Sequence, residues 1–472
     1  MNADHGAHGA PTPQLGTVAV GKSQSTGLSR RSLLKAGAGA TSGLGLFGPC
    51  ALPLISPRAT AAQGDALTFW QFYAPGGTVA TQATWFEECV AGWNAENERQ
   101  VELVYVPNSD YMDGTKLPTA FAAGEGPDLF IISPGDFLRY YNGGVLQDLT
   151  PFMEQEAIDD FFPDVLATRM VDDKVFGLPM EVEPMAMYYS VAAWDEAGLT
   201  DAEIPQTWDQ LLEVAQQLTT DQRFGVLFDV NPGYYQNFTW YPFMWQGGAE
   251  IQNADGTTSG MRDPGAVAAL KFWQDAVNAG VAPRTVLGGG GWDVVPNLST
   301  GYCAIQNVGI WAISALAEGA PDFEYGIFKL PIPEGGTYST DLGGWAFVAN
   351  SQGKDAEAAA QFCVWALGTM SEDSIQRGVD WCTVAKSDMA PRQSVQELAE
   401  QGGFSEGPLA QFAQEILPGG RAEPRVTPEI YKSISDAIQA AMLNGTDPQQ
   451  AAEQAATEIE AFLASYTGAP IL

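Results

Sequence analysis

The stretch LTFWQFYAPGGTVATQATWFEECVAGWNAENERQVELVYVPNSDYMDGTKLPTAFAAGEGPDLFIIS, residues 67–133, decides the fold of this chain. It contains three apolar runs typical of strands, namely Leu67–Phe72, Val101–Val106 and Asp128–Ser133. Two segments with apolar residues at helical spacing separate them, namely Val79–Glu98 and Tyr111–Ala123. This alternation predicts a parallel sheet with right-handed helical crossovers.

The middle of the chain again alternates predicted helices and strands. Thr207–Gln210 reads as a capping box that opens a helix to about Leu218, and Asp263-Pro264 opens another helix that ends by Gly280. Further strands are predicted at Phe224–Val230, Tyr302–Asn307, Tyr325–Leu330 and Gly344–Ala349. The chain after Asp355 is predicted to be mostly helical. Phe176–Ser190 has no helical stop signals and reads as an extended crossing, a natural hinge between two α/β units. The length after the leader also suits two lobes.

The N-terminal segment resembles an export signal. Ser29-Arg30-Arg31-Ser32-Leu33-Leu34-Lys35 precedes a mildly apolar run, Ala36–Ile55, and Ala59-Thr60-Ala61 offers a small-x-small cleavage pattern. The paired arginines indicate the twin-arginine route. We therefore expect residues 1–61 to be a signal peptide with a disordered leader extension, and the mature protein to begin near Ala62.

The composition of this leader disfavours two other interpretations. A membrane anchor is disfavoured because glycine and alanine dilute the run and Pro49, Pro53 and Pro57 interrupt it, whereas a spanning helix needs about 20 mostly apolar residues. Lipid anchoring at Cys50 is disfavoured because Pro49 stands where a lipobox has a small residue. We expect a periplasmic or cell-surface protein without a lipid anchor.

Composition excludes several functions. The two histidines, His5 and His8, both lie in the leader, so the mature chain cannot build a Ser-His-Asp or Cys-His catalytic unit, or a histidine-containing zinc or copper site. We expect no metal and no cofactor, although a calcium site made only of carboxylates stays open. The full chain has a net charge of −35, which disfavours binding to nucleic acid or anionic lipid.

Four cysteines follow the leader, namely Cys89, Cys303, Cys363 and Cys382. Exported chains can form disulfides, and Cys363 with Cys382 is the nearest pair in sequence. Two buried free thiols are an equal alternative. No CxxC spacing occurs, which disfavours a redox motif or metal knuckle.

Glu181 and Glu183 are two residues apart on the extended segment, so their side chains should point to the same side. Three interpretations are open. The pair could be exposed strand glutamates, hydrogen-bond acceptors for sugar hydroxyls, or the acid and nucleophile of a glycosidase. We expect the pair to accept hydrogen bonds from a bound sugar.

Aromatic residues gather next to glycines near predicted strand ends. Core packing explains many aromatics, but ligands bind at strand ends in α/β sheets, and flat rings suit the apolar faces of sugars. The candidates are Trp70, Tyr73, Tyr235, Trp240, Trp292, Trp311 and Trp345.

Arg421 and Arg425 could form salt bridges across the hinge, or could contact an anionic ligand. We include Arg425 among the candidate ligand residues. The run Gly288–Gly291 lacks the spacing and the lysine of a phosphate loop. No GxGxxG follows a predicted strand and no GxSxG occurs, so nucleotide binding and hydrolase chemistry of those types are disfavoured.

Several motifs together resemble the family 1 extracellular solute-binding proteins of carbohydrate ABC importers, the group that includes maltose-binding protein. The resemblance spans almost the whole mature chain. The motifs occur in order as AAGEGPDLFII (122–132), GGVLQDLTPF (143–152), GLPMEVEPMAMYYS (177–190), TWDQLLEVAQQLT (207–219), NVGIW (307–311), GGWAFVANSQGKDAEAAAQFCVWAL (343–367) and RVTPEIYKSISDAIQAAMLNGTDPQQAAEQA (425–455).

The resemblance implies an α/β, two-lobed periplasmic-binding-protein fold of type II, with the ligand in a cleft between lobes joined by extended hinge crossings. It implies a first lobe of residues 62–180 with about 345–420, and a second lobe of 181–344 with about 421–472, which includes hinge-spanning C-terminal helices. By position, family cleft residues match Ser133, Asp136, Glu183, Trp311, Gly343, Gly344 and Trp345. The chain departs from the family at Gly309-Ile310-Trp311, where Gly-Pro-Trp is common.

The resemblance also implies function. We expect a monomeric, non-enzymatic protein that closes its lobes on a sugar or oligosaccharide and delivers it to ABC permease subunits. One alternative is the same scaffold binding glycerol phosphate or another small polar solute. Others are a secreted glycosidase that uses Glu181 and Glu183, and a cell-surface scaffold that binds no small molecule.

Overall fold

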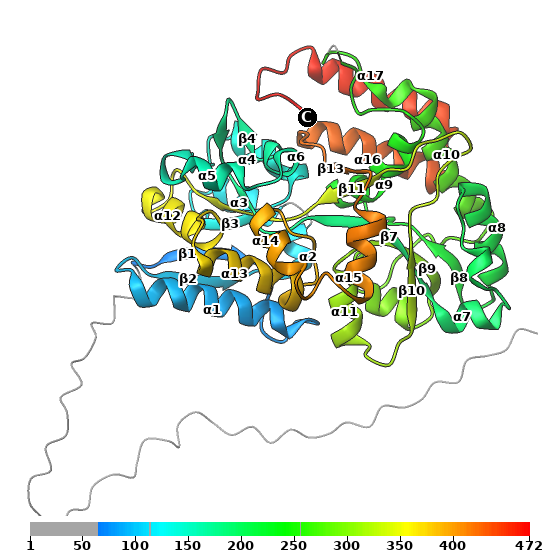
Figure 1. The fold of residues 1–472 in the computed structure, drawn as a ribbon. Helices are drawn as coiled ribbons and strands as arrows, with labels where there is room; N and C mark the ends of the chain where they lie inside the picture. Colours follow the sequence, from blue (N-terminus) through cyan, green and yellow to red (C-terminus); the bar gives the residue numbers. More distant parts are fainter. Residues whose placement is uncertain (1–64, 113–114, 255) are drawn as a thin grey trace, which may run out of the picture. The chain divides into compact units, whose positions relative to one another are not determined.

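The computed structural model describes residues 65–112, 115–254 and 256–472 (Figure 1). The twin-arginine motif, Cys50 and the cleavage pattern at Ala59–Ala61 lie outside these residues. Among the described helices, none has both the length and the apolar character that crossing a membrane requires.

The first sheet is built from the stretch that opens the folded chain. Its strands lie in the order β2, β1, β3, β12, β6. Their bounds are β1 (Leu67–Gln71), β2 (Val101–Tyr105), β3 (Leu129–Ile132), β6 (Leu178–Pro179) and β12 (Ala346–Ala349). β1 pairs in parallel with β2 and β3, which confirms the predicted parallel order, and β12 returns antiparallel to β3.

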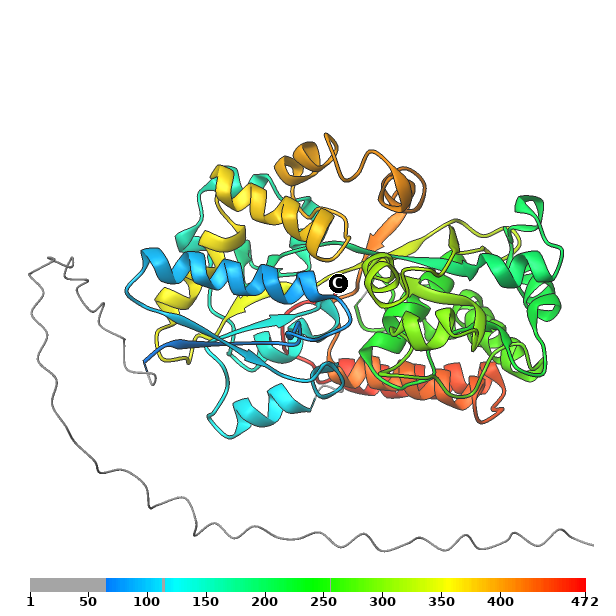
Figure 2. The ribbon, with the colours of Figure 1, turned by 90° about the horizontal axis from the view of Figure 1, so that it is seen from below.

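Helices cover this sheet and bury its aromatic core. α1 (Ala80–Glu96) buries Trp85, Phe86 and Trp93 on one face, as its spacing predicts, and lies alongside β1 and β2 (Figure 2). Phe69 of β1 meets Phe347 of β12 edge to face, with ring centroids 4.9 Å apart. The other helices before the second sheet or after β12 are α2 (Asn108–Met112), α3 (Lys116–Ala122), α4 (Pro134–Asn142), α5 (Gln155–Asp159), α6 (Pro163–Ala167), α12 (Ala356–Leu367), α13 (Glu372–Asp380), α14 (Gln393–Ala399) and α15 (Gly407–Gln411).

The second sheet does not repeat the three parallel strands that begin the first, because most of its strand pairs are antiparallel. Its order is β13, β11, β7, β9, β8, with β10 also paired to β7. The bounds are β7 (Glu183–Ser190), β8 (Phe224–Leu227), β9 (Cys303–Gly309), β10 (Tyr325–Phe328), β11 (Thr340–Gly343) and β13 (Gly420–Ala422). The hinge segment itself supplies β7, which runs antiparallel to β9, β10 and β11, while β8 and β9 are parallel. A small hairpin is formed by β4 (Met170–Val171) and β5 (Lys174–Val175).

The helices of the second sheet begin where the sequence predicts them. Thr207 and Gln210 form the capping box of α8 (Trp208–Leu218), and α10 (Pro264–Asn278) starts at its proline. Every residue of α9 (Tyr234–Gln246) is buried, so this aromatic-rich segment is a core helix. The remaining helices are α7 (Val191–Glu196), α11 (Ala312–Gly319), α16 (Pro428–Met442) and α17 (Pro448–Leu463).

Two connections between the sheets lie against each other. β6 of the first sheet leads into β7 of the second, and β11 of the second leads through Gly344 into β12 of the first. The Met180 amide donates to the Trp345 carbonyl at 2.9 Å. Gly344 has φ +124°, and a Cβ there would lie 2.5 Å from the Glu181 carbonyl oxygen, so only glycine fits. The predicted lobe boundaries remain a proposal.

All four described cysteines are buried and free. Of the two alternatives, a Cys363–Cys382 disulfide or buried free thiols, the structure shows free thiols. Burial raises the pKa of the Cys89 thiol to about 12, so it is protonated at neutral pH.

Candidate functional site

A cavity of about 600 Å³ lies at the carboxyl ends of the parallel strands. Residues that directly follow strands line it: Phe72 and Tyr73 follow β1, Asn108 comes after β2, and Ser133 follows β3. Strand ends of an α/β sheet converge at one edge, which is why these side chains meet. The volume lies in the range of about 300–1,000 Å³ that is typical of small-molecule sites.

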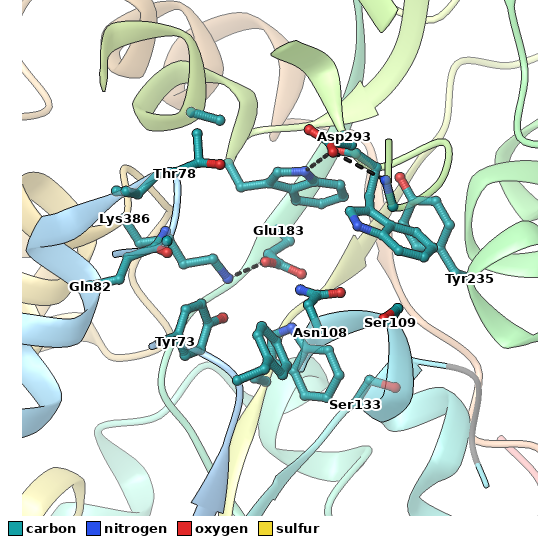
Figure 3. Close-up of a pocket in the computed structure, with 18 of the residues that line it drawn as sticks. Tyr73, Thr78, Gln82, Asn108, Ser109, Ser133, Glu183, Tyr235, Asp293 and Lys386 are labelled. Atoms are coloured by element: carbon teal, nitrogen blue, oxygen red, sulfur yellow. Dashed lines mark hydrogen bonds and ion pairs between the residues drawn. The ribbon is translucent and has the colours of Figure 1, made fainter. Parts of the chain in front are cut away.

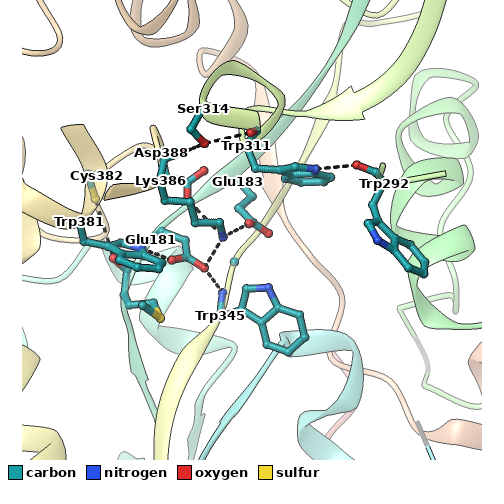
Figure 4. A network of polar contacts seen from close by, with 12 residues as sticks. Glu181, Glu183, Trp292, Trp311, Ser314, Trp345, Trp381, Cys382, Lys386 and Asp388 are labelled. Carbon is teal, nitrogen blue, oxygen red and sulfur yellow. Dashed lines mark hydrogen bonds and ion pairs between the residues drawn. The ribbon is translucent and has the colours of Figure 1, made fainter. Parts of the chain in front are cut away.

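Aromatic rings form the walls of the cavity. On the side of the first sheet, Trp345 packs edge to face on Phe72, with centroids 4.9 Å apart. On the side of the second sheet, Trp292 meets Tyr235 edge to face at 5.4 Å, and the Trp311 indole N–H donates to the Trp292 carbonyl at 3.2 Å. Figure 4 shows Trp311 and Trp345 on opposite sides of the Glu183 carboxylate. The cavity therefore offers rings on two walls.

Glycine permits the placement of Trp311. A Cβ on Gly309 would lie 1.9 Å from Cζ3 of the Trp311 ring. The indole thus folds back over the end of β9, where only a residue without a side chain leaves room. This gives a physical reason for the glycine–tryptophan spacing in the sequence.

A buried ion cluster lies beside the cavity around Lys386 (Figure 4). The Lys386 ammonium lies 3.1 Å from Glu181 Oε1 and 3.3 Å from Asp388 Oδ2, and it also contacts Glu183 Oε1. Burial alone would lower the pKa of Lys386, but the three carboxylates raise it well above its ordinary value, so Lys386 is charged. Burial raises the pKa of Glu183 to about 7 even though Lys386 acts in the opposite direction.

The three carboxylates of this cluster are close enough together to suggest a metal site. Lys386 occupies their common centre, however, and already supplies the positive charge. The prediction that the protein needs no metal stays a prediction.

Two more carboxylates line the cavity. The Gly135 amide in the first turn of α4 donates to Glu423 Oε1 at 3.1 Å, and burial raises the pKa of Glu423 to about 8. The Gly289 amide donates to Asp293 Oδ2 at 3.2 Å. No arginine is among the described residues that line the cavity. The acidic and basic side chains among these residues are therefore three carboxylic acids and Lys386, and Glu423 is mostly protonated at pH 7.

Several polar atoms at the cavity have no hydrogen-bond partner within the described residues. Among them are Ser133 Oγ, Tyr235 OH and Asn108 Oδ1. Figure 3 shows these side chains around Glu183. Buried polar groups are nearly always paired in folded proteins, so such atoms at a cavity indicate a polar ligand that completes them.

The structure brings most of the predicted site residues together. The cavity is lined by Tyr73, Ser133, Glu183, Tyr235, Trp292, Trp311, Gly344 and Trp345. They come from both sheets and from both connections between them. Their roles in binding are a proposal.

Glu181 and Trp240 do not line the cavity. Glu181 does point to the same side as Glu183, but it is fully buried, and its two oxygens accept hydrogen bonds from the Trp345 amide at 2.7 Å and from the Trp381 indole. Trp240 is fully buried in the core of the second sheet because α9 is covered on all faces.

Three further predicted residues lie elsewhere. Asp136 pairs with Arg139 one helical turn later, at 2.7 Å. Trp70 packs with the first core, and Lys116 lies 5.8 Å above its ring. Arg425 is 2% exposed and donates to the Pro470 carbonyl at 2.8 Å, so it fixes the C-terminal segment instead of a ligand.

Sequence reasoning missed Lys386, Glu423, Asp293 and Asn108. No motif marks them, because their places depend on contacts between distant segments. Only the structure marks this segment: Ser387, next to Lys386, has φ +67°. Such a conformation is uncommon for a non-glycine residue and is often found at functional sites.

The fold and the cavity suit a protein that binds a small molecule, and the family comparison agrees. Residues 76–372 match the bacterial extracellular solute-binding protein family, and the chain belongs to that family.

Individual relatives cover nearly the whole described chain. It is 25% identical to the arabinooligosaccharide-binding protein of Bacillus subtilis (strain 168), over 84% of this chain and 92% of the relative. It is 23% identical to the galactooligosaccharide-binding protein of the same strain, over 85% of this chain and 90% of that relative. The crystal structure of the cyclic alpha-maltosyl-1,6-maltose binding protein from Arthrobacter globiformis has a TM-score of 0.67 and 22% identity, and covers 85% of this chain and 99% of that chain. This last similarity supports the two-lobed fold.

Proposed function

We propose that this protein is the extracytoplasmic substrate-binding component of an ABC importer and that its ligand is a neutral sugar or oligosaccharide. Family membership supports the binding role. The relatives named for galactooligosaccharide and arabinooligosaccharide binding support a carbohydrate.

The observation that carries this proposal is the combination of rings and unpartnered polar atoms at one cavity. Trp311 and Trp345 offer flat faces that can bury the apolar faces of a sugar ring. Ser133 Oγ, Tyr235 OH and Asn108 Oδ1 can exchange hydrogen bonds with its hydroxyls. A polyhydroxylated, uncharged molecule satisfies both sets.

The charges disfavour the alternative of glycerol phosphate or another anionic solute. The carboxyl groups of Glu183 and Asp293 line the cavity, Glu423 is mostly a neutral acid at pH 7 because its pKa is about 8, and the one described cationic side chain, Lys386, is already held by three carboxylates. An anion would meet repulsion without a free basic partner.

The glycosidase alternative that uses Glu181 and Glu183 lacks one of its two carboxylates at the cavity. A retaining or inverting glycosidase needs two carboxyl groups that flank the bond to be cleaved. Glu183 reaches the cavity, but Glu181 is buried behind it, with both oxygens engaged by N–H donors. We therefore propose binding without catalysis.

The binding cycle follows from the two-lobed family fold. The lobes close on the sugar, and the closed form docks on the permease subunits. Closure follows ligand binding only if the ligand binds the closed form more tightly than the open form. We propose that the protein acts as a monomer and requires neither a metal nor a cofactor.

A thermal-shift screen of the mature protein against neutral mono- and oligosaccharides, polyols and sugar phosphates tests the proposal. A ligand at 100 times its Kd adds about 2.7 kcal/mol of stability. We expect saturable stabilisation by a neutral saccharide. Stabilisation only by phosphorylated solutes, or by none of the compounds, would contradict the proposal.

We also propose export by the twin-arginine route with cleavage close to Ala61, because Arg30-Arg31 precedes a mildly apolar run and a small-residue exit. Mass spectrometry of the exported protein should find an N-terminus near Ala62. Export that persists in an Arg30→Lys, Arg31→Lys variant, or an acylated Cys50, would contradict this route or the unanchored form.

A further inference from the structure

Lys386 connects segments that are far apart in the sequence. It follows η5 (Trp381–Ala385), yet its ammonium lies among carboxylates of the β6–β7 connection, more than 200 residues earlier. The backbone turns through a left-handed Ser387 to place Asp388 on the same ammonium. Lys386 itself is only 3% exposed and lines the cavity together with Glu183.

We propose that Lys386 is a positioning residue of the sugar site that fixes the place and the charge of the Glu183 carboxylate. This inference rests on the proposed function. The ammonium contacts Glu183 directly, and Glu181 and Asp388 hold the ammonium from the other side. Glu183 is thereby kept as an acceptor that faces the cavity.

The same ammonium is linked to an aromatic wall. Glu181 Oε1 contacts Lys386 Nζ at 3.1 Å and accepts the backbone N–H of Trp345 at 2.7 Å. Glu181 Oε2 accepts the indole N–H of Trp381. The acceptor Glu183 and the Trp345 ring are therefore held by one network, which fixes the spacing between a hydrogen-bonding group and a stacking surface. Figure 4 shows this network beside the cavity.

Charge supports the geometry. Burial raises the pKa of Glu183 to about 7, Lys386 lowers it and Glu181 raises it. The other titratable or charged groups that interact with Glu183 are Arg169, Glu423, Asp388, Tyr235 and Tyr73. An opposite charge at contact distance lowers the pKa of a carboxyl by about 1–3 units. Loss of the ammonium should therefore protonate Glu183 at neutral pH.

A pH titration of intrinsic tryptophan fluorescence in the ligand-free mature protein tests this directly. Trp345 and Trp381 both donate to Glu181 and report on the network. Wild type should show a transition near pH 7 that disappears in Glu183→Gln, which assigns it. In Lys386→Met the transition should move up by about 1–3 units. In Lys386→Arg, which keeps the charge, it should stay close to the wild-type value.

Binding supplies the second readout, with maltotriose, galactotriose and arabinotriose as probes in calorimetry. Because an ionised carboxylate is the better acceptor, affinity in wild type should rise as the pH rises through about 7. In Lys386→Met the rise should shift to higher pH, and affinity at pH 7 should fall at least about fivefold, because a shift of one unit or more leaves about a tenth of Glu183 ionised.

Arg392→Met is the matched control, since Arg392 forms a buried ion pair with Asp160 at 2.7 Å and does not line the cavity. It should lower the melting temperature without moving the transition. If Lys386→Met does not fold, the Lys386→Met, Glu181→Gln double variant removes one charge of each sign. Its transition should still lie above that of wild type, because Lys386 has the larger effect on Glu183.

Asp229 and Glu423 have raised pKa values of about 7 and 8, so the transition that counts is the one that Glu183→Gln removes. The absence of any such transition, or its staying at the wild-type pH in the folded Lys386 variant, would overturn the positioning role. If the transition moves as expected but none of the sugar probes binds in the thermal-shift screen or in calorimetry, the charge network stands and the proposed function fails. The two failures are thus distinguishable.

Discussion

Gly309→Ala should weaken ligand binding by displacing the Trp311 ring, which lies directly against Gly309. A Cβ at this position would lie 1.9 Å from Cζ3 of Trp311, whereas ordinary contacts of this kind are 3.4–4 Å long. The backbone at Gly309 is held by pairing with Met185 of β7, so we expect the indole to move. Movement also breaks the 3.2 Å hydrogen bond from the indole to the Trp292 carbonyl.

The size of the effect follows from the lost ring contact. Burial of a large apolar side chain is worth about 1.5–3 kcal/mol, which corresponds to about tenfold to hundredfold in affinity. Trp311→Ala should lose that amount, and Gly309→Ala should approach it. Calorimetry with the sugar that stabilises wild type most strongly measures both variants, after melting curves have established that each is folded.

A double-mutant cycle separates this mechanism from a general disturbance. In the Trp311→Ala background, Gly309→Ala should cost little further affinity, because the ring that it displaces is gone. Gly402→Ala is the control, since no atom lies within 4 Å of a Cβ built there. Wild-type affinity in folded Gly309→Ala would refute the assignment of Trp311 to the ligand, and fully additive losses would refute its mechanism.

Three further predictions follow from the same site. Trp345→Ala and Glu183→Gln should each lower affinity by about tenfold to hundredfold in calorimetry, since they remove a ring or a charged acceptor worth about 1.5–3 kcal/mol; folded variants that bind like wild type would contradict the site. Burial raises the pKa of Glu423 to about 8, so the folded protein holds a proton that an unfolded glutamic acid releases near pH 4.3. The stability that depends on this proton is therefore complete below about pH 4.3 and is lost as the pH rises through about 8. Glu423→Gln should flatten this decline in thermal unfolding curves recorded between pH 5 and 9. A melting temperature that falls with pH as steeply in Glu423→Gln as in wild type would contradict this prediction. Unfolding curves with and without a chelator should coincide, because Lys386 occupies the centre of the one carboxylate cluster found among the described residues.

The fold could be predicted where the signal is local. The apolar runs around Leu67 and Leu129 and the helix between Ala80 and Glu96 are periodic, so the three parallel strands of the first sheet were predictable. The mixed second sheet was not, because the direction of β7 depends on pairing with strands more than a hundred residues away.

The site residues could likewise be predicted only where a local sequence signal marks them. Trp311 and Trp345 could be predicted because neighbouring glycines leave room for their rings or for the chain crossing. Trp240 could not be distinguished from them, since only packing on every side of α9 reveals it as a core residue. Lys386 carries no local signal at all, because its partners lie on another segment of the chain.

The central claim is that an acidic, aromatic-walled cavity selects a neutral carbohydrate. The most direct measurement is a calorimetric titration, at one pH and ionic strength, of the best stabilising neutral sugar against its uronic acid counterpart, which differs by one carboxylate. We predict saturable binding of the neutral sugar and binding of the acid that is weaker by tenfold or more, because the acid meets the carboxyl groups of Glu183 and Asp293 without a free basic partner. Equal or tighter binding of the acid would contradict it.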